Sequence, residues 1–498
     1  MNPMKHLAWL SLILVVLLTG GLYWISTPRH ASLSKEPLVF YCAAGLKTPV
    51  EETARQYEQE YGVPIRLEYG GSGTLLSKLR VTDSADLYLA ADETYVDLAR
   101  QQDLLAETIP LARIRPVIAV LKDNPKGIHS LRGLLRDDVR LALANPAAAS
   151  VGRTARELLR AAGLWDAIEK KTKVFKPTVN DIANDVKIGA VDAGIVWDLT
   201  AGLYPELEIV RCPEFEAGAQ RISVSVLKKS RQATAALRFA RYLGAQDRGL
   251  VHFARMTCEP VEGDVWEETP RVVFYSGGVN RLAIQETIEQ FARREGVVVD
   301  TIYNGCGILV GQMKTGSRPD AYFACDVSFV NPVADLFEDP LAISETSMGI
   351  LVAKGNPKAI HGLPSLTAPG LRIGLANAEQ SALGSLTKDL LTEMGLYETI
   401  LPNVRSQTPT ADLLVNQIRT GSLDAVIVYE ANTAYVRDQL DWIPIDHPRA
   451  RAVQPFAVGK DSRHPQLMAR LLNAIRSAES RAKFETTGFR WLAGPAYN

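Results

Sequence analysis

The chain has 498 residues, of which 47% are hydrophobic and 22% are charged, as is typical of a globular protein with several compact units. The formal net charge is -1, and no basic run or low-complexity tract occurs, so binding to nucleic acid or another polyanion is disfavoured. The five cysteines form no CxxC motif and no Cys/His cluster with the spacing of metal ligands, which disfavours a structural metal site.

Residues 7–25 near the N-terminus are apolar and contain no charged side chain. About 20 apolar residues are enough to cross a bilayer as a helix, and Tyr23 and Trp24 suit the membrane interface. We therefore expect residues 1–26 to be an uncleaved signal anchor, a transmembrane helix, with a cleaved secretory signal as the alternative. Lys5 on the leading side predicts that the rest of the chain lies outside the cytoplasm.

Residues 27–37 follow as a polar linker, and beyond them apolar strand patterns alternate with helical patterns. Strands are expected at 38–42 and 64–69, at a run ending with Asp92, and at 140–144 and 193–197; helices are expected at 49–61, from Thr74 and near Gly152. Strands that alternate with helices predict parallel strands with crossover helices, hence an α/β fold.

The whole pattern then occurs a second time. Residues 39–41 return 234 positions later as 273–275, and the Gly-Ser-Gly of 71–73 returns as the Gly-Cys-Gly of 305–307. After a two-residue deletion, 124–126 return as 356–358. Because this period is far longer than that of a solenoid, each copy is expected to be a complete domain with its own core. We place these domains at 38–265 and 271–498, with the junction between them in the acidic segment 262–269, before Pro270.

Small-residue turns follow the strands of each copy. In open α/β sheets, ligands lie beyond the carboxyl ends of the strands, where helix N-termini converge. Free backbone N–H groups and the positive helix end suit an anion at such turns. Each copy is therefore predicted to hold a small, anionic ligand.

The turns of the first copy carry a family resemblance. In order and at the expected spacing, they resemble type II periplasmic solute-binding proteins of the molybdate-binding kind, through segments 40–46, 71–75, 85–92, 145–152 and 194–197. The second copy resembles them more weakly. The resemblance implies two α/β lobes that are joined by crossing strands and close on a tetrahedral oxyanion, which hydroxyls and backbone N–H groups hold. It also implies uptake through an ABC transporter permease, with no catalysis and no cofactor.

The resemblance assigns ligand-binding positions to both copies. In the first copy they fall on Gly45, Ser72, Gly73, Val151, Asn180 and Trp197, and in the second on Val279, Cys306, Leu383, Asp412 and Tyr429. The first copy keeps one of two serine hydroxyls and the second keeps neither. A carboxylate at Asp412 would repel a dianion. The first copy is thus expected to bind an oxyanion, and the second something else or nothing.

Alternatives remain for several of these residues. Ser72 could instead cap a helix, and Trp197 could belong to the core. Cys306 could be inert packing, a thiol ligand or a redox centre, in which case Cys325 is its expected partner. At the level of function, the alternatives are a membrane-anchored sensor or partner-binding scaffold, and a thiol-dependent enzyme or redox protein.

Overall fold

The computed structural model describes residues 36–493. The predicted membrane anchor at 1–26 lies outside these residues, as does most of the linker. Within 36–493, no helix combines the length and the apolar character needed to span a bilayer.

The first domain has two lobes, each built on its own sheet. The sheet of the first lobe has the strand order β11-β4-β10-β3-β1-β2, and that of the second lobe β7-β6-β8-β5-β9. The strands are β1 (Leu38–Ala43), β2 (Ile65–Gly70), β3 (Leu87–Ala90), β4 (Leu105–Ile114), β5 (Pro116–Leu121), β6 (Leu141–Ala144), β7 (Phe175–Lys176), β8 (Ala193–Trp197), β9 (Leu207–Val210), β10 (Gln220–Leu227) and β11 (Glu259–Pro260). The helices are α2 (Lys47–Tyr61), α3 (Ser72–Leu79), α4 (Glu93–Gln101), α5 (Ser150–Ala161), α6 (Trp165–Lys171), α7 (Val179–Lys187), α8 (Asp198–Ala201), α9 (Ala233–Leu243) and α10 (Gly249–Ala254).

The second domain repeats this plan on one larger sheet, whose main order is β13-β12-β14-β20-β15-β18-β16-β17. Its strands are β12 (Arg271–Gly277), β13 (Val298–Asn304), β14 (Ala321–Phe323), β15 (Leu341–Ala353), β16 (Ile373–Ala376), β17 (Val404–Thr408), β18 (Ala425–Tyr429), β19 (Leu440–Pro444), β20 (Arg451–Val458) and β21 (Arg490–Trp491). Its helices are α11 (Arg281–Glu295), α12 (Cys306–Lys314), α13 (Ala382–Glu393), α14 (Tyr397–Ile400), α15 (Ala411–Arg419), α16 (Pro465–Ile475) and α17 (Ala478–Thr486), and the 3-10 segments η4 (Gly278–Asn280) and η5 (Val327–Phe329) belong to its first lobe.

The sheets are mixed rather than purely parallel. β1 is parallel to β2 and β3, as predicted, but β10 runs antiparallel to β3 and β4. The antiparallel strands are the ones that connect the two lobes, which the sequence patterns did not identify. Because these strands leave the first lobe and return to it, they run against the βαβ units. The α/β fold and the two-lobed domains are confirmed, and the all-parallel expectation is wrong.

The crossing strand differs between the domains. In the second domain β15 is continuous: its first half pairs with β20 and its second half with β18. There the Met348 N–H donates to the Ala450 carbonyl at 2.7 Å. The matched residue of the first domain is Pro116, which has no N–H to donate. Accordingly, the strand is interrupted there and appears as β4 and β5 on either side of Arg115.

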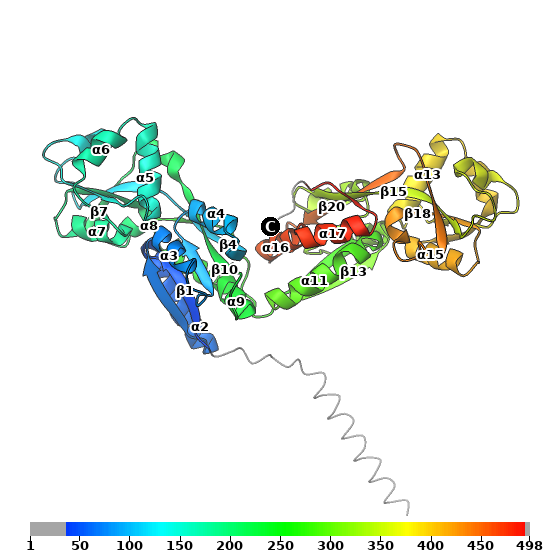
Figure 1. The fold of residues 1–498 in the computed structure, drawn as a ribbon, viewed down its shortest axis with the longest axis horizontal. Helices are drawn as coiled ribbons and strands as arrows, with labels where there is room; N and C mark the ends of the chain where they lie inside the picture. The colour runs from blue at the N-terminus through cyan, green and yellow to red at the C-terminus, as the bar shows by residue number, and fades with distance from the viewer. Residues whose placement is uncertain (1–35, 494–498) are drawn as a thin grey trace, which may run out of the picture.

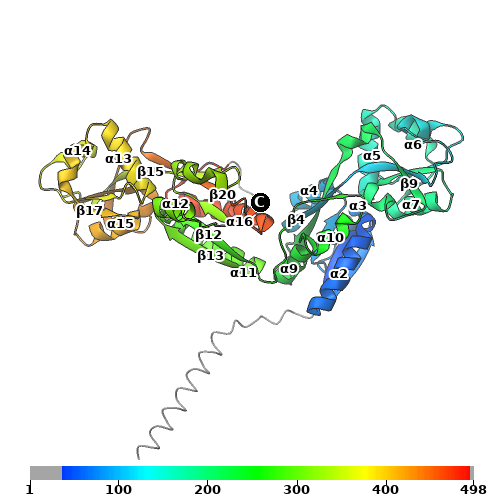
Figure 2. The same ribbon diagram turned by 180° about the vertical axis from the view of Figure 1, so that it is seen from behind.

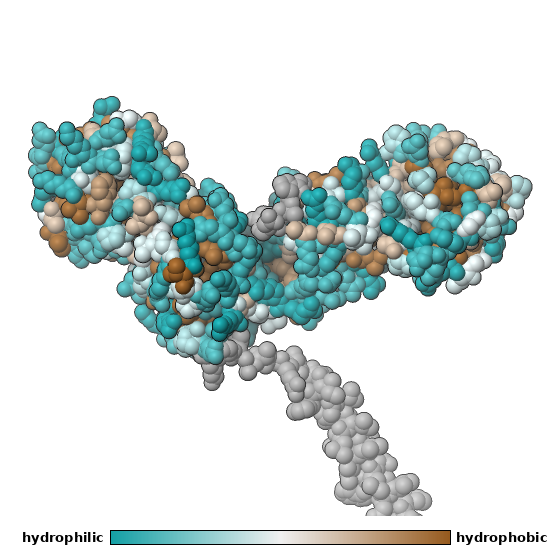
Figure 3. Space-filling view, in the orientation of Figure 1, coloured by the Kyte–Doolittle hydropathy of each residue, from teal (hydrophilic) through white to brown (hydrophobic). Residues whose placement is uncertain are grey.

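Each domain has its own hydrophobic core, as the repeat predicted. Buried clusters of the first domain lie between Leu38 and Phe253, and those of the second lie between Val272 and Phe489. The first lobes of the two domains meet at the centre of the molecule, whereas the second lobes lie at its two far ends (Figures 1 and 2). The face drawn in Figure 3 is largely hydrophilic, with hydrophobic side chains in small, separate groups.

Polar contacts join the two first lobes. The Arg294 guanidinium of α11 donates to both carboxylate oxygens of Glu107 in β4, at 2.7 and 2.9 Å. The Asp264 carboxylate accepts from the backbone N–H groups of Gln466 and Leu467 at the start of α16, at 2.7 and 3.0 Å. The bidentate pair of Arg294 and Glu107 fixes the relative orientation of the two groups as well as their distance.

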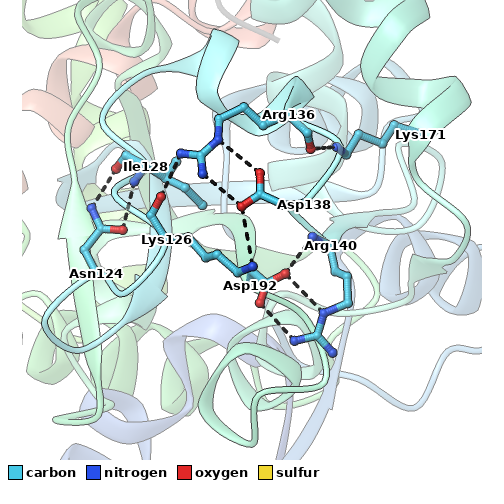
Figure 4. A network of polar contacts seen from close by, with 8 residues as sticks. All are labelled: Asn124, Lys126, Ile128, Arg136, Asp138, Arg140, Lys171 and Asp192. Atoms are coloured by element: carbon cyan, nitrogen blue, oxygen red, sulfur yellow. Dashed lines mark hydrogen bonds and ion pairs between the residues drawn. The ribbon is translucent and has the colours of Figure 1, made fainter.

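The matched Asn-Pro-Lys segments are explained by a turn in the second lobe of each domain. The Asn124 side chain donates to the Ile128 carbonyl and accepts from the Ile128 N–H, both at 2.9 Å (Figure 4). Asn356 makes the same two bonds to Ile360, at 2.8 and 3.0 Å. Both asparagines have a positive φ, 42° and 46°, which asparagine tolerates better than most residues. This repeated motif is therefore structural.

Two matched aspartates begin the segments after β3 and β14. Asp92 caps α4, its Oδ1 accepting from the Tyr95 N–H at 3.0 Å, and Asp326 caps η5 by accepting from the Ser328 N–H at 3.0 Å. Asp326 Oδ2 also accepts from the Val453 N–H at 3.1 Å, whereas Asp92 Oδ2 is buried without a hydrogen-bond partner among residues 36–493. This burial raises the pKa of Asp92 to about 6.

The pKa of Asp92 predicts a pH-dependent stability of the first domain. Since the unfolded pKa is about 3.9, the folded state binds more protons between about pH 4 and 6, and the free energy of unfolding falls as pH rises through this window. Asp92→Asn keeps an oxygen that can cap the helix. It is expected to reduce the decrease in the free energy of unfolding across this pH window by about 1–3 kcal/mol. Urea unfolding at pH 4 to 7 measures it. An unchanged slope would contradict the assignment, and Asp326→Asn, which removes an acceptor that is in use, is expected to lower stability.

Candidate ligand-binding clefts

A cleft lies between the two lobes of the first domain. One side consists of the turns after β1, β2 and β3, and the other of the starts of α5 and α7 together with the end of β8. Its lining residues are Ala43, Ala44, Gly45, Gly70, Gly71, Ser72, Ala91, Ala149, Ser150, Val151, Thr178, Val179 and Trp197. None of these carries a charged side chain. The cavity volume is about 10 Å³, roughly enough for one water molecule, so the lobes are closed on each other.

Hydrogen bonds to backbone carbonyls hold the lobes together. The Gly73 N–H of α3 donates to the Ala148 carbonyl of the opposite lobe at 3.0 Å, and the side-chain amide of Asn180 donates to the Ala44 carbonyl at 3.1 Å. A Cβ at Gly71 would lie 2.3 Å from the Ala148 oxygen. Only glycine allows this approach. Two predicted ligand residues, Gly73 and Asn180, therefore lie outside the lining of the cavity and bridge the lobes instead.

Ser72 lies at the first position of α3 and is 1% exposed. Its Oγ accepts a hydrogen bond from the Ala91 N–H at 3.1 Å. No side chain caps α3, and its N-cap residue is Gly71, so the interpretation of Ser72 as an N-cap is wrong. With its oxygen already accepting, the hydroxyl can direct its hydrogen into the cleft. The described contacts of residues 36–493 include no acceptor for that hydrogen.

Gly45 occupies the position where the resemblance implies a second hydroxyl. A Cβ at Gly45 would lie 2.8 Å from Thr200 Oγ1 and 2.8 Å from Val179 Cγ1. The Thr200 side chain is thus close to the space where a side chain at position 45 would begin. Thr200 is fully buried, and its Oγ1 has no hydrogen-bond partner among the described residues. Thr200 is not among the residues that line the cavity, but its hydroxyl approaches from the second lobe the space that a side chain at position 45 would occupy.

Sequence reasoning did not identify Thr200. The signal that could have identified Thr200 is its place three residues after Trp197. Its match in the second copy, 232 positions later, is Asn432, which lines the second cleft. Trp197 itself ends β8 and lines the first cleft, with 1% exposure.

Two helices begin at the first cleft. Val151 is the second residue of α5, and Val179 and Asn180 begin α7. The first N–H groups of a helix have no acceptor within it, and the described contacts assign none to these three. They are neutral donors at the positive ends of helices.

The second domain has a similar cleft of about 20 Å³. Its lining residues are Gly278, Val279, Asn304, Gly305, Cys325, Ser381, Leu383, Pro409, Thr410, Ala411, Asp412, Tyr429 and Asn432. Four of the five predicted positions are therefore present, and Cys306 is the exception. The lobes are held in the same way, since the Gly307 N–H donates to the Gln380 carbonyl at 3.0 Å.

The chemistry of the second cleft is different. Asp412 takes the place of Asn180 and accepts from the Asn432 amide at 2.9 Å. Burial raises the pKa of Asp412, although the hydrogen bond from Asn432 opposes that shift. The Tyr429 hydroxyl is buried without a described partner. Cys306 lies behind the lining, where its Sγ accepts from the Cys325 N–H at 3.0 Å, as Ser72 Oγ does from Ala91.

Comparison with known proteins agrees with this architecture. A family described as "Bacterial extracellular solute-binding protein" matches residues 38–248 and again 272–490. The chain is 33% identical over 165 residues to a Haemophilus influenzae protein, covering 33% of this chain and 67% of that protein. It is 27% identical over 225 residues to the molybdate-binding protein ModA of Mycobacterium bovis, covering 44% of this chain and 84% of the relative.

A solved structure of the same kind is the periplasmic molybdate-binding protein of Azotobacter vinelandii. It is 17% identical, covers 45% of this chain and 100% of its own, and has a TM-score of 0.39. Since the family match spans most of the sequence in two copies, this chain belongs to the bacterial extracellular solute-binding proteins.

Proposed function

We propose that this protein is an extracytoplasmic solute-binding protein that binds a small tetrahedral oxyanion, of the molybdate or tungstate kind, in its first cleft. In this role it delivers the ligand to an ABC-type permease, a task that needs neither catalysis nor a cofactor. The observation that carries the proposal is the pair of buried hydroxyls, Ser72 and Thr200, that have no acceptor for their hydrogens. The molybdate-binding name of the Mycobacterium bovis relative supports the ligand class.

A cleft of neutral donors suits a dianion. Hydrogen bonds to a charged acceptor are about twice as strong as those between neutral groups. Aligned N–H groups at helix starts supply partial positive charge, so no Arg or Lys is needed. In this structure the two lobes are in contact across the cleft. Binding therefore requires that the lobes first separate, which breaks the contacts of Gly73 and Asn180 with the opposite lobe.

The second cleft is not part of this proposal, because Asp412 places a carboxylate where the first cleft has an amide. An ionised carboxylate and a dianion repel each other. We therefore assign one oxyanion site to each chain. The scaffold or sensor role is not favoured, since the family and the relatives are described as binding proteins.

Ligand binding is expected to stabilise the full chain. Molybdate, tungstate, sulfate and phosphate are tested separately by thermal shift, and at least one should raise the melting temperature. At a ligand concentration 100 times its Kd, the free energy of unfolding should increase by about 2.7 kcal/mol. Isothermal titration should give one site per chain. The absence of a shift with all four anions would refute the proposal, and two equal sites would refute the assignment to the first cleft.

Removal of either hydroxyl is expected to weaken oxyanion binding. Ser72→Ala and Thr200→Val each delete a donor to a charged ligand, so Kd should rise about 10-fold or more. Because the Thr200 hydroxyl has no partner, Thr200→Val should not lower the free energy of unfolding. Titration and urea unfolding together separate the two effects.

The matched control for Ser72→Ala is Cys306→Ala in the second domain, which should leave the oxyanion Kd unchanged. Equal losses of affinity from Ser72→Ala and Cys306→Ala would contradict the assigned site.

We also propose that residues 1–26 tether the protein to the outer face of the inner membrane. In fractionated cells, a tethered chain of full mass is expected in the membrane fraction after a carbonate wash. A shortened chain in the periplasmic fraction would instead identify a cleaved signal.

A further inference from the structure

Two thiols lie side by side beneath the second cleft. Cys306 is the first residue of α12, and Cys325 follows β14. Their Sγ atoms are 2.6 Å apart, and the Cys325 N–H donates to Cys306 Sγ at 3.0 Å. Both side chains are buried, with exposures of 0% and 6%. In this structure all five cysteines of the chain are free thiols.

The first domain shows that the fold does not need this pair. At the matched positions it has Ser72 and Ala91, and the Ala91 N–H donates to Ser72 Oγ at 3.1 Å. The same backbone contact thus forms around a hydroxyl and a methyl group. Two adjacent sulfurs at these positions are a feature of the second domain alone.

Access to the pair is unequal. Cys325 lines the second cleft and Cys306 does not. When the lobes separate, Cys325 is therefore the sulfur that a reagent reaches first. Although burial acts to raise the pKa of Cys306, the neighbouring Cys325, whose backbone N–H donates to Cys306 Sγ, holds it below its ordinary value. Cys306 is thus the better thiolate of the two and is placed behind Cys325, where it can attack a modified Cys325.

The family to which the chain belongs is described as extracellular, and disulfides persist in oxidising compartments. We propose that Cys306 and Cys325 form a disulfide in the exported protein, by exchange with an oxidised dithiol protein or a small-molecule disulfide. In the first step, Cys325 attacks the oxidant RSSR, forming a mixed disulfide and releasing RSH. In the second, the Cys306 thiolate attacks Cys325 Sγ, the S–S bond between Cys325 and the RS group breaks, and the released RS⁻ takes up a proton and leaves as a second RSH. The two cysteines lose two electrons and two protons, which the oxidant gains.

The bond changes the second cleft. It links the start of α12 to the segment after β14, two turns of the same lobe that form the floor of the cleft. It also removes both thiol hydrogens, so the second cleft has no donor where Ser72 has a hydroxyl in the first. This inference rests on family membership and on the second domain, and does not depend on oxyanion binding by the first.

The test counts thiols in the full chain. Protein prepared without reductant is denatured and alkylated with iodoacetamide, with and without prior reduction, and its mass is measured by mass spectrometry. We expect three alkylated cysteines without reductant and all five after reduction, and a crosslinked peptide pair containing Cys306 and Cys325. Five alkylated cysteines, even after incubation with oxidised glutathione, would overturn the proposal. Protection of Cys212 and Cys258 instead would also overturn it.

The matched variant is Cys306→Ser with Cys325→Ala, which installs the pair present in the first domain. It should show three alkylated cysteines in both conditions. Reductant should lower the melting temperature of the second domain in the wild type, by roughly 5–10 °C for a closed loop of this length, and should not change that of the variant. An equal effect of reductant on both proteins would contradict the assigned pair.

Discussion

Both clefts depend on two stretches of backbone that pass closer than a side chain would allow. In the first domain Gly71 and Gly73 approach the carbonyls of residues 147 and 148, and in the second Gly305 and Gly307 approach those of 379 and 380. A Cβ at Gly307 would lie 1.9 Å from the Glu379 oxygen, a distance that no other residue could accept. The glycines therefore let the lobes close, and the residue between them is held at the seam, as Ser72 in one copy and Cys306 in the other.

The frame around this seam is shared, whereas its chemistry is not. Matched backbone contacts, such as those of Gly73 and Gly307, recur with the same length. The side chains at the cleft differ in ways that alter charge and hydrogen-bonding capacity: Asn180 against Asp412, Thr200 against Asn432, and Trp197 against Tyr429. A duplicated domain can change its recognition in this manner without changing its fold, because function depends on the site.

Much of the fold could be predicted because the strand and helix patterns occur twice in the same order. The helix expected at 49–61 is α2, at Lys47–Tyr61, and the strand expected at 193–197 is β8. The family resemblance implied crossing strands between the lobes, but the sequence patterns did not identify β4 and β10 as those strands. In the site, eight of the eleven positions line a cleft. Gly73, Asn180 and Cys306 do not, because the Gly73 N–H and the Asn180 side-chain amide donate to carbonyls of the opposite lobe and Cys306 Sγ accepts from the Cys325 N–H. Thr200 was missed because its role depends on the approach of a second lobe to Gly45, which only the folded chain reveals.

The proline in the first crossing strand has a mechanical consequence. In the second domain the single strand β15 runs from one lobe into the other, pairing first with β20 and then with β18. At Pro116 the matched strand is interrupted, so the two lobes of the first domain can rotate with the loss of fewer backbone bonds. The easier pivot belongs to the domain whose cleft has the neutral donors, while the stiffer one belongs to the domain with paired thiols.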